Sequence, residues 1–198
     1  MKTQKIGIQW DIGSYNYIAI QNYLSKTGIE AEIIPLYTTE WVLQALQNET
    51  IDMGQFALAN STGGLVDETI RVLGYYHWEY ITHYAIKIEH CILARVWSRL
   101  EDISVIMAHE QALRQCGSNL LKFYPEKSLQ SGEEEWSDNA RIARGIAHGE
   151  LPENIACLGH HSLAELYGLQ ILAEWLQDRI DNETTFVLVQ PLTSISIG

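Results

Sequence analysis

The first 75 residues alternate between strand-like and helix-like segments, and this alternation restricts the possible folds more than any other feature of the sequence. Residues 5–10 alternate apolar and polar side chains as a strand does, and residues 30–36 and 53–59 are short apolar runs of strand length. Helix-like segments begin after Ser14 and after Thr38. Short connections between such segments predict a mostly parallel sheet covered by helices, which is an α/β fold.

The second half of the chain continues this alternation without repeating the sequence of the first half. Its expected strands and helices lie at residues 103–108, 109–117 (ending near Gly117), 138–149, 154–158, 160–167 and 184–189. Residues 78–96 predict one long extended strand that crosses between two lobes. Residues 128–137 predict a solvated loop, and residues 169–177 a helix or turn.

The expected organisation is therefore one domain, residues 1–198, made of two α/β lobes with a cleft between them. Lobe 1 is expected to contain about residues 1–80 plus 182–198, because the last strand returns to the first sheet. Lobe 2 is expected to contain about residues 95–180. Ligands of such sheets bind at the carboxyl ends of the strands, where Gly13-Ser14 and Asn60-Ser61-Thr62 are expected.

The segment 57–66 reads as a buried strand, a polar loop with two glycines, and the start of a helix near Leu65. Backbone N–H groups at a helix start, together with the hydroxyls of Ser61 and Thr62, suit a carboxylate or phosphate. The same residues are also ordinary helix-capping and turn residues, so both interpretations are open at this point.

Composition excludes several classes of protein. The net charge of −12 argues against nucleic-acid binding, which requires a basic surface. No apolar run of 18 residues and no N-terminal targeting pattern is present, so we expect a soluble, cytoplasmic protein without a membrane anchor. The three cysteines lie far apart within apolar stretches, which indicates buried free thiols. No metal-ligand spacing or nucleotide-binding glycine loop occurs, so we expect no metal and no cofactor.

Five short motifs resemble those of prephenate dehydratases, in the same order and at the same intervals. They are Gly13-Ser14-Tyr15, Asn60-Ser61-x-x-Gly64-x-Val66, His109-x-Gln111-Ala112-Leu113-x-Gln115-Cys116, Ala164-Glu165-x-Tyr167-Gly168-Leu169 and Asn182-x-Thr184-x-Phe186. The resemblance covers roughly residues 5–190. It implies a fold similar to the two-lobed, periplasmic-binding-protein-like catalytic domain of that family, with prephenate in the cleft. The regulatory ACT domain that usually follows is not expected in this chain.

The chain departs from the family motifs at several positions. The family's Pro-Ile-Glu is Ala57-Leu58-Ala59 here, so the glutamate is lost, and its Thr-Arg-Phe is Thr184-Thr185-Phe186, so the arginine is lost. The family's Ser-His-Pro-Gln-Ala corresponds to Ala-His-Glu-Gln-Ala at residues 108–112 of this chain. A serine that the family has in the second lobe is replaced by His160. A dehydratase needs a proton donor at the departing hydroxyl and a cation to hold the substrate, and these changes remove charged groups suited to both tasks.

The sequence therefore looks most like the non-aromatising prephenate decarboxylases of bacterial peptide-antibiotic pathways, of the bacilysin and aeruginosin types. The reaction implied is loss of the ring carboxylate with retention of the hydroxyl, giving a dihydro-4-hydroxyphenylpyruvate. Two alternatives are a prephenate dehydratase that gives phenylpyruvate and a non-catalytic module that binds prephenate. A homodimer is possible.

The resemblance assigns roles to particular residues. The candidates for catalysis are Thr184, which matches the family's catalytic threonine, and His109 and His160 as proton donors; a bound water is a further alternative. The candidate substrate-binding residues are Ser14, Asn60, Ser61, Thr62, Gln111, Ala112, Leu113, Arg141, Thr185 and Phe186. The backbone N–H groups of residues 111–113 are expected to hold the pyruvyl carboxylate at a helix start. Arg141 either replaces the missing cation or lies on a solvated helix face.

Overall fold

The computed structural model describes residues 3–192, so the ends of the expected lobe 1 lie outside the described residues. The chain divides into two compact units, residues 1–86 with 183–198 (unit 1) and residues 87–182 (unit 2). Each unit contains one sheet with helices packed against it, and the predicted α/β class is confirmed.

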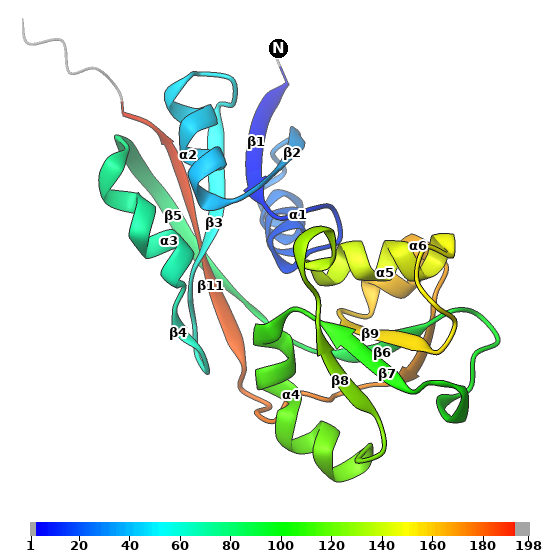
Figure 1. Cartoon of the computed structure of the whole chain (residues 1–198). Helices are drawn as coiled ribbons and strands as arrows, with labels where there is room; N and C mark the ends of the chain where they lie inside the picture. Colours follow the sequence, from blue (N-terminus) through cyan, green and yellow to red (C-terminus); the bar gives the residue numbers. More distant parts are fainter. Residues whose placement is uncertain (1–2, 193–198) are drawn as a thin grey trace, which may run out of the picture. The chain divides into compact units, whose positions relative to one another are not determined.

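Unit 1 is built on a sheet in the order β2-β1-β3-β11-β5, with β4 paired to the end of β3 (Figure 1). Its strands are β1 (Gln4–Gln9), β2 (Ala31–Tyr37), β3 (Met53–Asn60), β4 (Gly64–Leu65), β5 (Trp78–Lys87) and β11 (Glu183–Pro191). The pairs β1–β2 and β1–β3 are parallel, whereas β11 runs antiparallel to β3. The carboxyl ends of β1, β2 and β3 therefore lie at one edge of this sheet.

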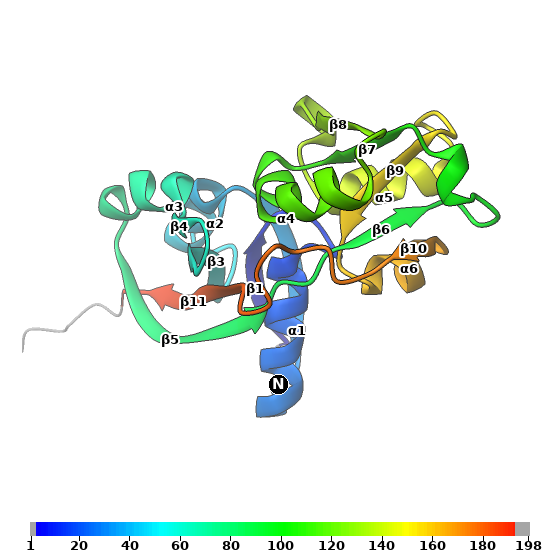
Figure 2. The same ribbon diagram turned by 90° about the horizontal axis from the view of Figure 1, so that it is seen from below.

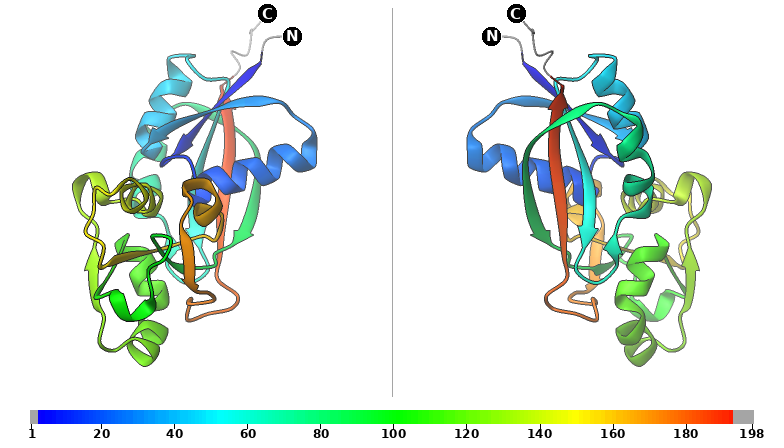
Figure 3. Two further views of the ribbon diagram at one scale, coloured as in Figure 1. Left: turned by 90° about the vertical axis from the view of Figure 1, so that its right-hand side faces the viewer. Right: turned by 90° about the vertical axis from the view of Figure 1, so that its left-hand side faces the viewer.

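Helices cover both faces of this sheet (Figure 3). The helices are α1 (Tyr15–Thr27), α2 (Thr39–Gln47) and α3 (Asp67–Val72), followed by a 3-10 turn, η1 (Leu73–Tyr75). On one face Ile20 of α1 packs with Ile6 and Ile8, and on the other Val42 and Leu46 of α2 pack with other strand residues. Capping side chains define the helix starts, since Ser14 caps α1 and Thr38 caps α2.

Unit 2 has a sheet in the order β10-β6-β9-β7-β8 (Figure 2). Its strands are β6 (Cys91–Ala94), β7 (Val105–Ala108), β8 (Ser128–Ser131), β9 (Ile155–Gly159) and β10 (Gln170–Ala173). Its helices are α4 (Glu110–Phe123), α5 (Asn139–His148) and α6 (Ser162–Tyr167), with 3-10 turns η2 (Leu100–Asp102) and η3 (Glu134–Trp136). Helix α4 contributes to one apolar cluster of the sheet, and α5 and α6 contribute to the other.

The predicted junction at residues 57–66 is wrong in one respect. The loop after Asn60 does not start a helix; it turns the chain into β4, which pairs antiparallel with the end of β3. Helix α3 begins later, at Asp67, and carries Asp67 and Glu68 in its first turn. These two carboxylates compete with an external anion for the N-terminus of this short helix, and the anion site expected at Ser61 and Thr62 stays a prediction.

Four other boundaries also differ from the prediction. Helix α4 continues through Gly117 to Phe123 because Leu120 is fully buried and fixes the next turn. Residues 128–131 are exposed but form the edge strand β8, whose backbone pairs with β7. Residues 170–173 form a strand antiparallel to β6, and their pairing partner cannot be inferred from local sequence. The expected long strand over 78–96 is interrupted at residues 88–90, so β5 belongs to unit 1 and β6 to unit 2.

Candidate active site

The side chain of Asn60 organises the end of β3 in unit 1. Its carbonyl oxygen Oδ1 accepts hydrogen bonds from the backbone N–H groups of Thr62 (2.9 Å) and Gly63 (2.8 Å). Its amide nitrogen Nδ2 donates to the backbone oxygen of Glu183 (3.1 Å) and to Oγ1 of Thr184 (2.9 Å). Asn60 is 4% exposed. It therefore both shapes the turn and joins that turn to the start of β11.

Ser61 reinforces the same junction. Its backbone N–H donates to the backbone oxygen of Glu183 (2.8 Å), and its hydroxyl oxygen accepts from the backbone N–H of Glu183 (2.9 Å). The structure thus brings together four predicted site residues, Asn60, Ser61, Thr62 and Thr184. Because Thr184 Oγ1 accepts a hydrogen bond from Asn60, its own hydroxyl hydrogen can be donated to another acceptor.

The residues that follow Thr184 alternate between the two faces of the sheet. Phe186 is 1% exposed and packs with Ala19 and Ala57, so its side chain is part of the core. Thr185 points to the opposite face, where it lines an apolar cavity of about 320 Å³. The other residues that line this cavity are Phe56, Leu58, Leu73, Trp78, Tyr80, His83 and Val187. Thr185 and Phe186 therefore lie on opposite faces of the sheet.

Ala59 and Thr185 are directly opposite each other in the antiparallel pair of β3 and β11. The pair adjoins a shift in register between Thr185 and Phe186, since Phe186 is opposite Ala57. Ala59 and Thr185 are the two positions at which the sequence departs from the Glu and Arg of the resembled motifs. The two departures, 126 positions apart in the chain by their numbering, therefore fall on one cross-strand pair.

Ser14 lies at the carboxyl edge of the parallel strands as predicted from its position after β1. Its Oγ accepts a hydrogen bond from the backbone N–H of Tyr17 (3.3 Å), and the residue is 7% exposed. The described contacts therefore give this hydroxyl a capping role at the start of α1.

In unit 2, the start of α4 is organised by His109. Its ring nitrogen Nδ1 accepts from the backbone N–H of Gln111 (3.1 Å), and its backbone oxygen accepts from the N–H groups of Ala112 (2.9 Å) and Leu113 (3.2 Å). The three N–H groups predicted to hold a carboxylate thus already have partners within the unit. The backbone N–H of His109 donates to Oδ1 of Asn139 (2.7 Å), which links the starts of α4 and α5.

The two candidate histidines are both harder to protonate than an exposed histidine. Burial, and to a smaller extent neighbouring His161, whose ring centroid lies 3.9 Å away, together lower the pKa of His160 to about 4. Burial also lowers the pKa of His109, against the opposing effect of Glu110. Both imidazoles are therefore mainly neutral at pH 7 in the free protein and carry no imidazolium proton to donate.

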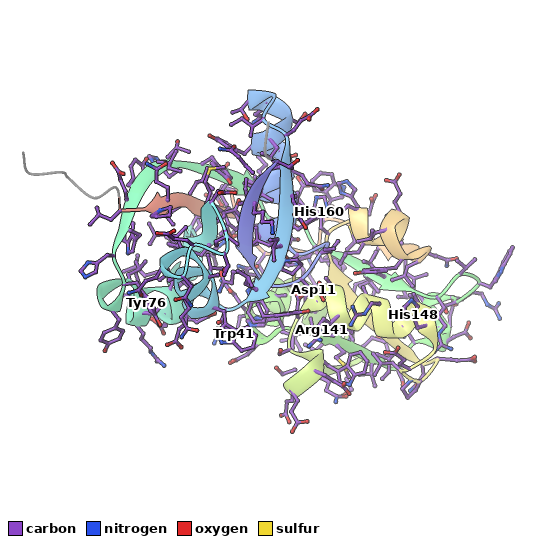
Figure 4. All side chains as sticks on the ribbon, turned by 90° about the horizontal axis from the view of Figure 1, so that it is seen from above. Asp11, Trp41, Tyr76, Arg141, His148 and His160 are labelled. Atoms are coloured by element: carbon purple, nitrogen blue, oxygen red, sulfur yellow. The ribbon has the colours of Figure 1, made fainter. Side chains whose placement is uncertain are left out.

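Arg141 lies in the first turn of α5, and His148 lies at the other end of the same helix (Figure 4). Arg141 belongs to unit 2. It remains a candidate for the missing cation on the basis of sequence alone.

A polar network beneath the carboxyl edge of unit 1 was not predicted. Gln9 Oε1 accepts from the backbone N–H of Ala57 (3.2 Å), and its Nε2 donates to Glu68 (2.7 Å). Gln55 Nε2 donates to the backbone oxygen of Asn16 (2.8 Å), and Tyr84 donates to Gln55 Oε1. The available signal was a glutamine inside each of two otherwise apolar strands, since a buried amide requires partners.

Within residues 3–192, no cluster of three or more His, Cys, Asp or Glu side chains is arranged to hold a metal ion. Among the same residues, no helix combines the length and the apolar character required to cross a membrane.

The fold and site define an α/β protein of two sheets, with an Asn–Ser turn joined to a threonine on the returning strand. The family model for prephenate dehydratase matches residues 6–193. The chain belongs to the prephenate dehydratase family.

Individual relatives agree with this assignment. Arogenate dehydratase 1 of Petunia hybrida is 30% identical over 187 residues, which are 94% of this chain and 42% of that protein. A bifunctional chorismate mutase/prephenate dehydratase of Buchnera aphidicola is 25% identical over 192 residues, which are 95% of this chain and 49% of that protein. The chain thus spans less than half the length of these curated relatives.

Solved structures establish the same fold. A prephenate dehydratase from Arthrobacter aurescens, in complex with L-Phe, superposes with a TM-score of 0.83 at 23% identity. The alignment covers 94% of this chain and 60% of that protein's chain. The fold is therefore that of the prephenate dehydratase catalytic domain.

Proposed function

We propose that this chain is a cofactor-free lyase that decarboxylates prephenate without making the ring aromatic. The observation that carries the proposal is the contrast between two neighbouring residue pairs on β3 and β11. Asn60 and Thr184 match the family and are hydrogen-bonded at 2.9 Å. Ala59 and Thr185, the next pair, replace the Glu and Arg of the resembled motifs with uncharged side chains.

The missing charges determine which bond is expected to break. Aromatisation expels both carbon dioxide and the ring hydroxyl, and the hydroxyl leaves readily only if an acid protonates it. Decarboxylation breaks only the carbon–carbon bond to the ring carboxylate, whose electron pair enters the diene. One proton is then added to another ring carbon, the hydroxyl is retained, and the products are carbon dioxide and a dihydro-4-hydroxyphenylpyruvate.

Thr184 is the proposed residue for positioning or donating the proton to the ring. Its hydroxyl hydrogen is available because its oxygen accepts from Asn60. His109 and His160 are weaker candidates for the donor in the free protein, since burial lowers the pKa of each. A bound dianion would favour the charged imidazolium and raise both pKa values.

The second candidate function is dehydration of prephenate or of arogenate. It is favoured by the names of the relatives, which are arogenate dehydratases and bifunctional chorismate mutase/prephenate dehydratases. A third candidate, a module that binds prephenate without turnover, fits the same fold.

Product analysis separates these candidates. Purified protein is incubated with prephenate at pH 7.5, and the products are followed by proton NMR and by the absorbance of the phenylpyruvate enol. The proposal predicts release of carbon dioxide and a product with olefinic ring protons and a carbinol proton. Phenylpyruvate as the main product would establish the dehydratase instead. Calorimetric binding of prephenate without any product would establish the binding module.

A further inference from the structure

Two aromatic residues at the carboxyl edge of unit 1 have a backbone conformation that favours glycine. Trp10 directly follows β1 and has φ = 67°, and Tyr37 ends β2 and has φ = 61°. They face each other in an isolated antiparallel bridge, in which the N–H of Trp10 donates to the oxygen of Tyr37 over 3.0 Å. Large side chains rarely occupy this left-handed region, and residues held there often serve a binding or catalytic site.

Hydrogen bonds on both sides hold this strained pair in place. Glu68 Oε2 accepts from the side chain of Gln9 (2.7 Å), and Oε1 accepts from the backbone N–H of Thr39 (2.9 Å). Gln9 precedes Trp10, and Thr39 lies two residues after Tyr37. The surrounding structure therefore fixes the backbone at this edge before any ligand arrives, which is how a preorganised site is built.

A third aromatic side chain extends the pair. Trp41 is 52% exposed, and its ring lies edge-on to that of Tyr37, with 6.3 Å between ring centroids and an interplanar angle of 89°. The rings of Trp10 and Tyr37 are both partly exposed. Trp41 is labelled in Figure 4, and the label of Asp11 marks the position directly after Trp10 in the sequence. Trp10 and Tyr37 thus meet through their backbones, and Tyr37 and Trp41 through their rings, at the edge where α/β sheets bind their ligands.

The charges at this edge indicate which part of a ligand it accepts. Asp11, which is 8% exposed, follows Trp10 in the sequence, and Glu40 precedes Trp41, so both tryptophans have an acidic neighbour along the chain. A carboxylate placed here would be repelled, whereas an uncharged unsaturated ring gains apolar contact and ring–ring interactions.

We propose that Trp10, Tyr37 and Trp41 form a subsite that binds the unsaturated six-membered ring of the ligand, with its carboxylates directed away from Asp11 and Glu40. The identity of that ring as a cyclohexadienyl ring rests on the proposed function. The existence of the subsite is inferred from the strained pair Trp10 and Tyr37, independently of the proposed function. The same apolar and ring–ring contacts would also bind a planar aromatic ring.

The substitution Trp10→Gly tests the subsite with little risk of unfolding, because glycine adopts φ = 67° more readily than tryptophan does. Phenylpyruvate, which has a planar ring and a pyruvyl carboxylate, is the calorimetric probe. We expect W10G to weaken its binding by about tenfold or more, and W10F, which keeps a ring, to bind within about threefold of wild type. Thermal unfolding is expected to show that W10G is folded.

Trp97 provides the matched control, since it also has a left-handed backbone (φ = 77°), belongs to unit 2 and is 89% exposed. W97G is expected to leave phenylpyruvate binding unchanged. The proposal is overturned if W10G binds phenylpyruvate as wild type does, if W97G loses binding equally, or if the wild-type protein does not bind phenylpyruvate. Ring binding that depends on Trp10, without any product from prephenate, would refute the proposed function and support the subsite.

Discussion

The side-chain amide of Asn60 and the hydroxyl oxygen of Thr184 lie 2.9 Å apart and form a hydrogen bond, although 124 positions separate them in the chain. The bond connects the carboxyl end of β3 with the start of β11, so it fixes the one hydroxyl on β11 that the proposed chemistry uses. Two predictions follow from this junction, and two concern the scaffold.

Replacing Thr184 with valine removes the hydroxyl and keeps the branched shape. We expect Thr184→Val to lower kcat by ~10²–10⁴-fold if Thr184 positions or donates the ring proton. Asn60 Nδ2 keeps its bond to the oxygen of Glu183, so the stability loss is about 1 kcal/mol. The matched control is Thr184→Ser, which retains the hydroxyl and is expected to keep most of the activity. Steady-state kinetics of both variants measure this difference in kcat. A near-normal kcat in T184V would contradict the proposed role of the Thr184 hydroxyl in protonating the ring.

Restoring both charges on the cross-strand pair is expected to change the product. The double variant Ala59→Glu/Thr185→Arg places opposite charges on residues that face each other, and such pairs contribute about 0.2–1 kcal/mol. We expect the double variant to convert part of the prephenate to phenylpyruvate, as measured by enol absorbance. The neutral double variant A59Q/T185Q is the control and should not do so. If the two double variants give the same product ratio, the charges do not select the reaction.

Two helix glycines are expected to respond to alanine in opposite directions. A Cβ atom at Gly117 in α4 would meet no heavy atom within 4 Å, so Gly117→Ala stabilises by ~0.5–1 kcal/mol through reduced entropy of the unfolded chain. A Cβ at Gly145 in α5 would lie 2.3 Å and 2.6 Å from ring carbons of Trp136, so Gly145→Ala costs about 1–3 kcal/mol.

Urea unfolding of both alanine variants, compared with wild type at equal pH, measures this difference. A rise of the midpoint for G117A and a fall for G145A confirm the packing of the two helices. A stable G145A would show that Trp136 does not pack on α5 as described.

Buried His90 is expected to make stability depend on pH. Burial lowers its pKa to about 4, while in the unfolded chain it is ordinary, so the unfolded state binds more protons between these two values. The contribution of neutral His90 to the free energy of unfolding is therefore fully present above about pH 6.5 and is lost as the pH falls toward 4. From pH 7 to pH 5 this one group removes about 2 kcal/mol.

The measurement is urea unfolding of wild type, His90→Gln and His148→Gln at both pH values. H90Q should lose less stability on acidification than wild type does, whereas H148Q, which changes an exposed residue, should lose as much. Equal losses in all three proteins would show that His90 does not carry the effect.

Local sequence was sufficient for elements whose signals are local. The caps Ser14, Thr38 and Asp138 and the left-handed glycines Gly28 and Gly149 mark helix ends where the structure has them. Strand β10 and the exposed strand β8 were missed because each is defined by a backbone partner that lies far away in the chain. Helix α4 passes Gly117 because packing of Leu120 outweighs the low helix propensity of one glycine.

The candidate site shows the same division. The motifs placed Asn60 and Thr184 in one site, and the structure joins them, yet the pairing of Ala59 with Thr185 depends on the register of β3 with β11. The strained conformations of Trp10 and Tyr37 have no sequence signal, since nothing in either residue type favours a positive φ.

The sequence by itself determined the α/β class, several of the helix ends and the family, because these depend on periodicity, capping and motif spacing along the chain. Only the tertiary structure decided which side chains meet, namely that the two altered motif positions oppose each other as Ala59 and Thr185, and that two aromatic residues face each other at the end of β1 and β2. The physical reason is that strand register and backbone strain are set by hydrogen bonds between distant segments, which no local pattern encodes.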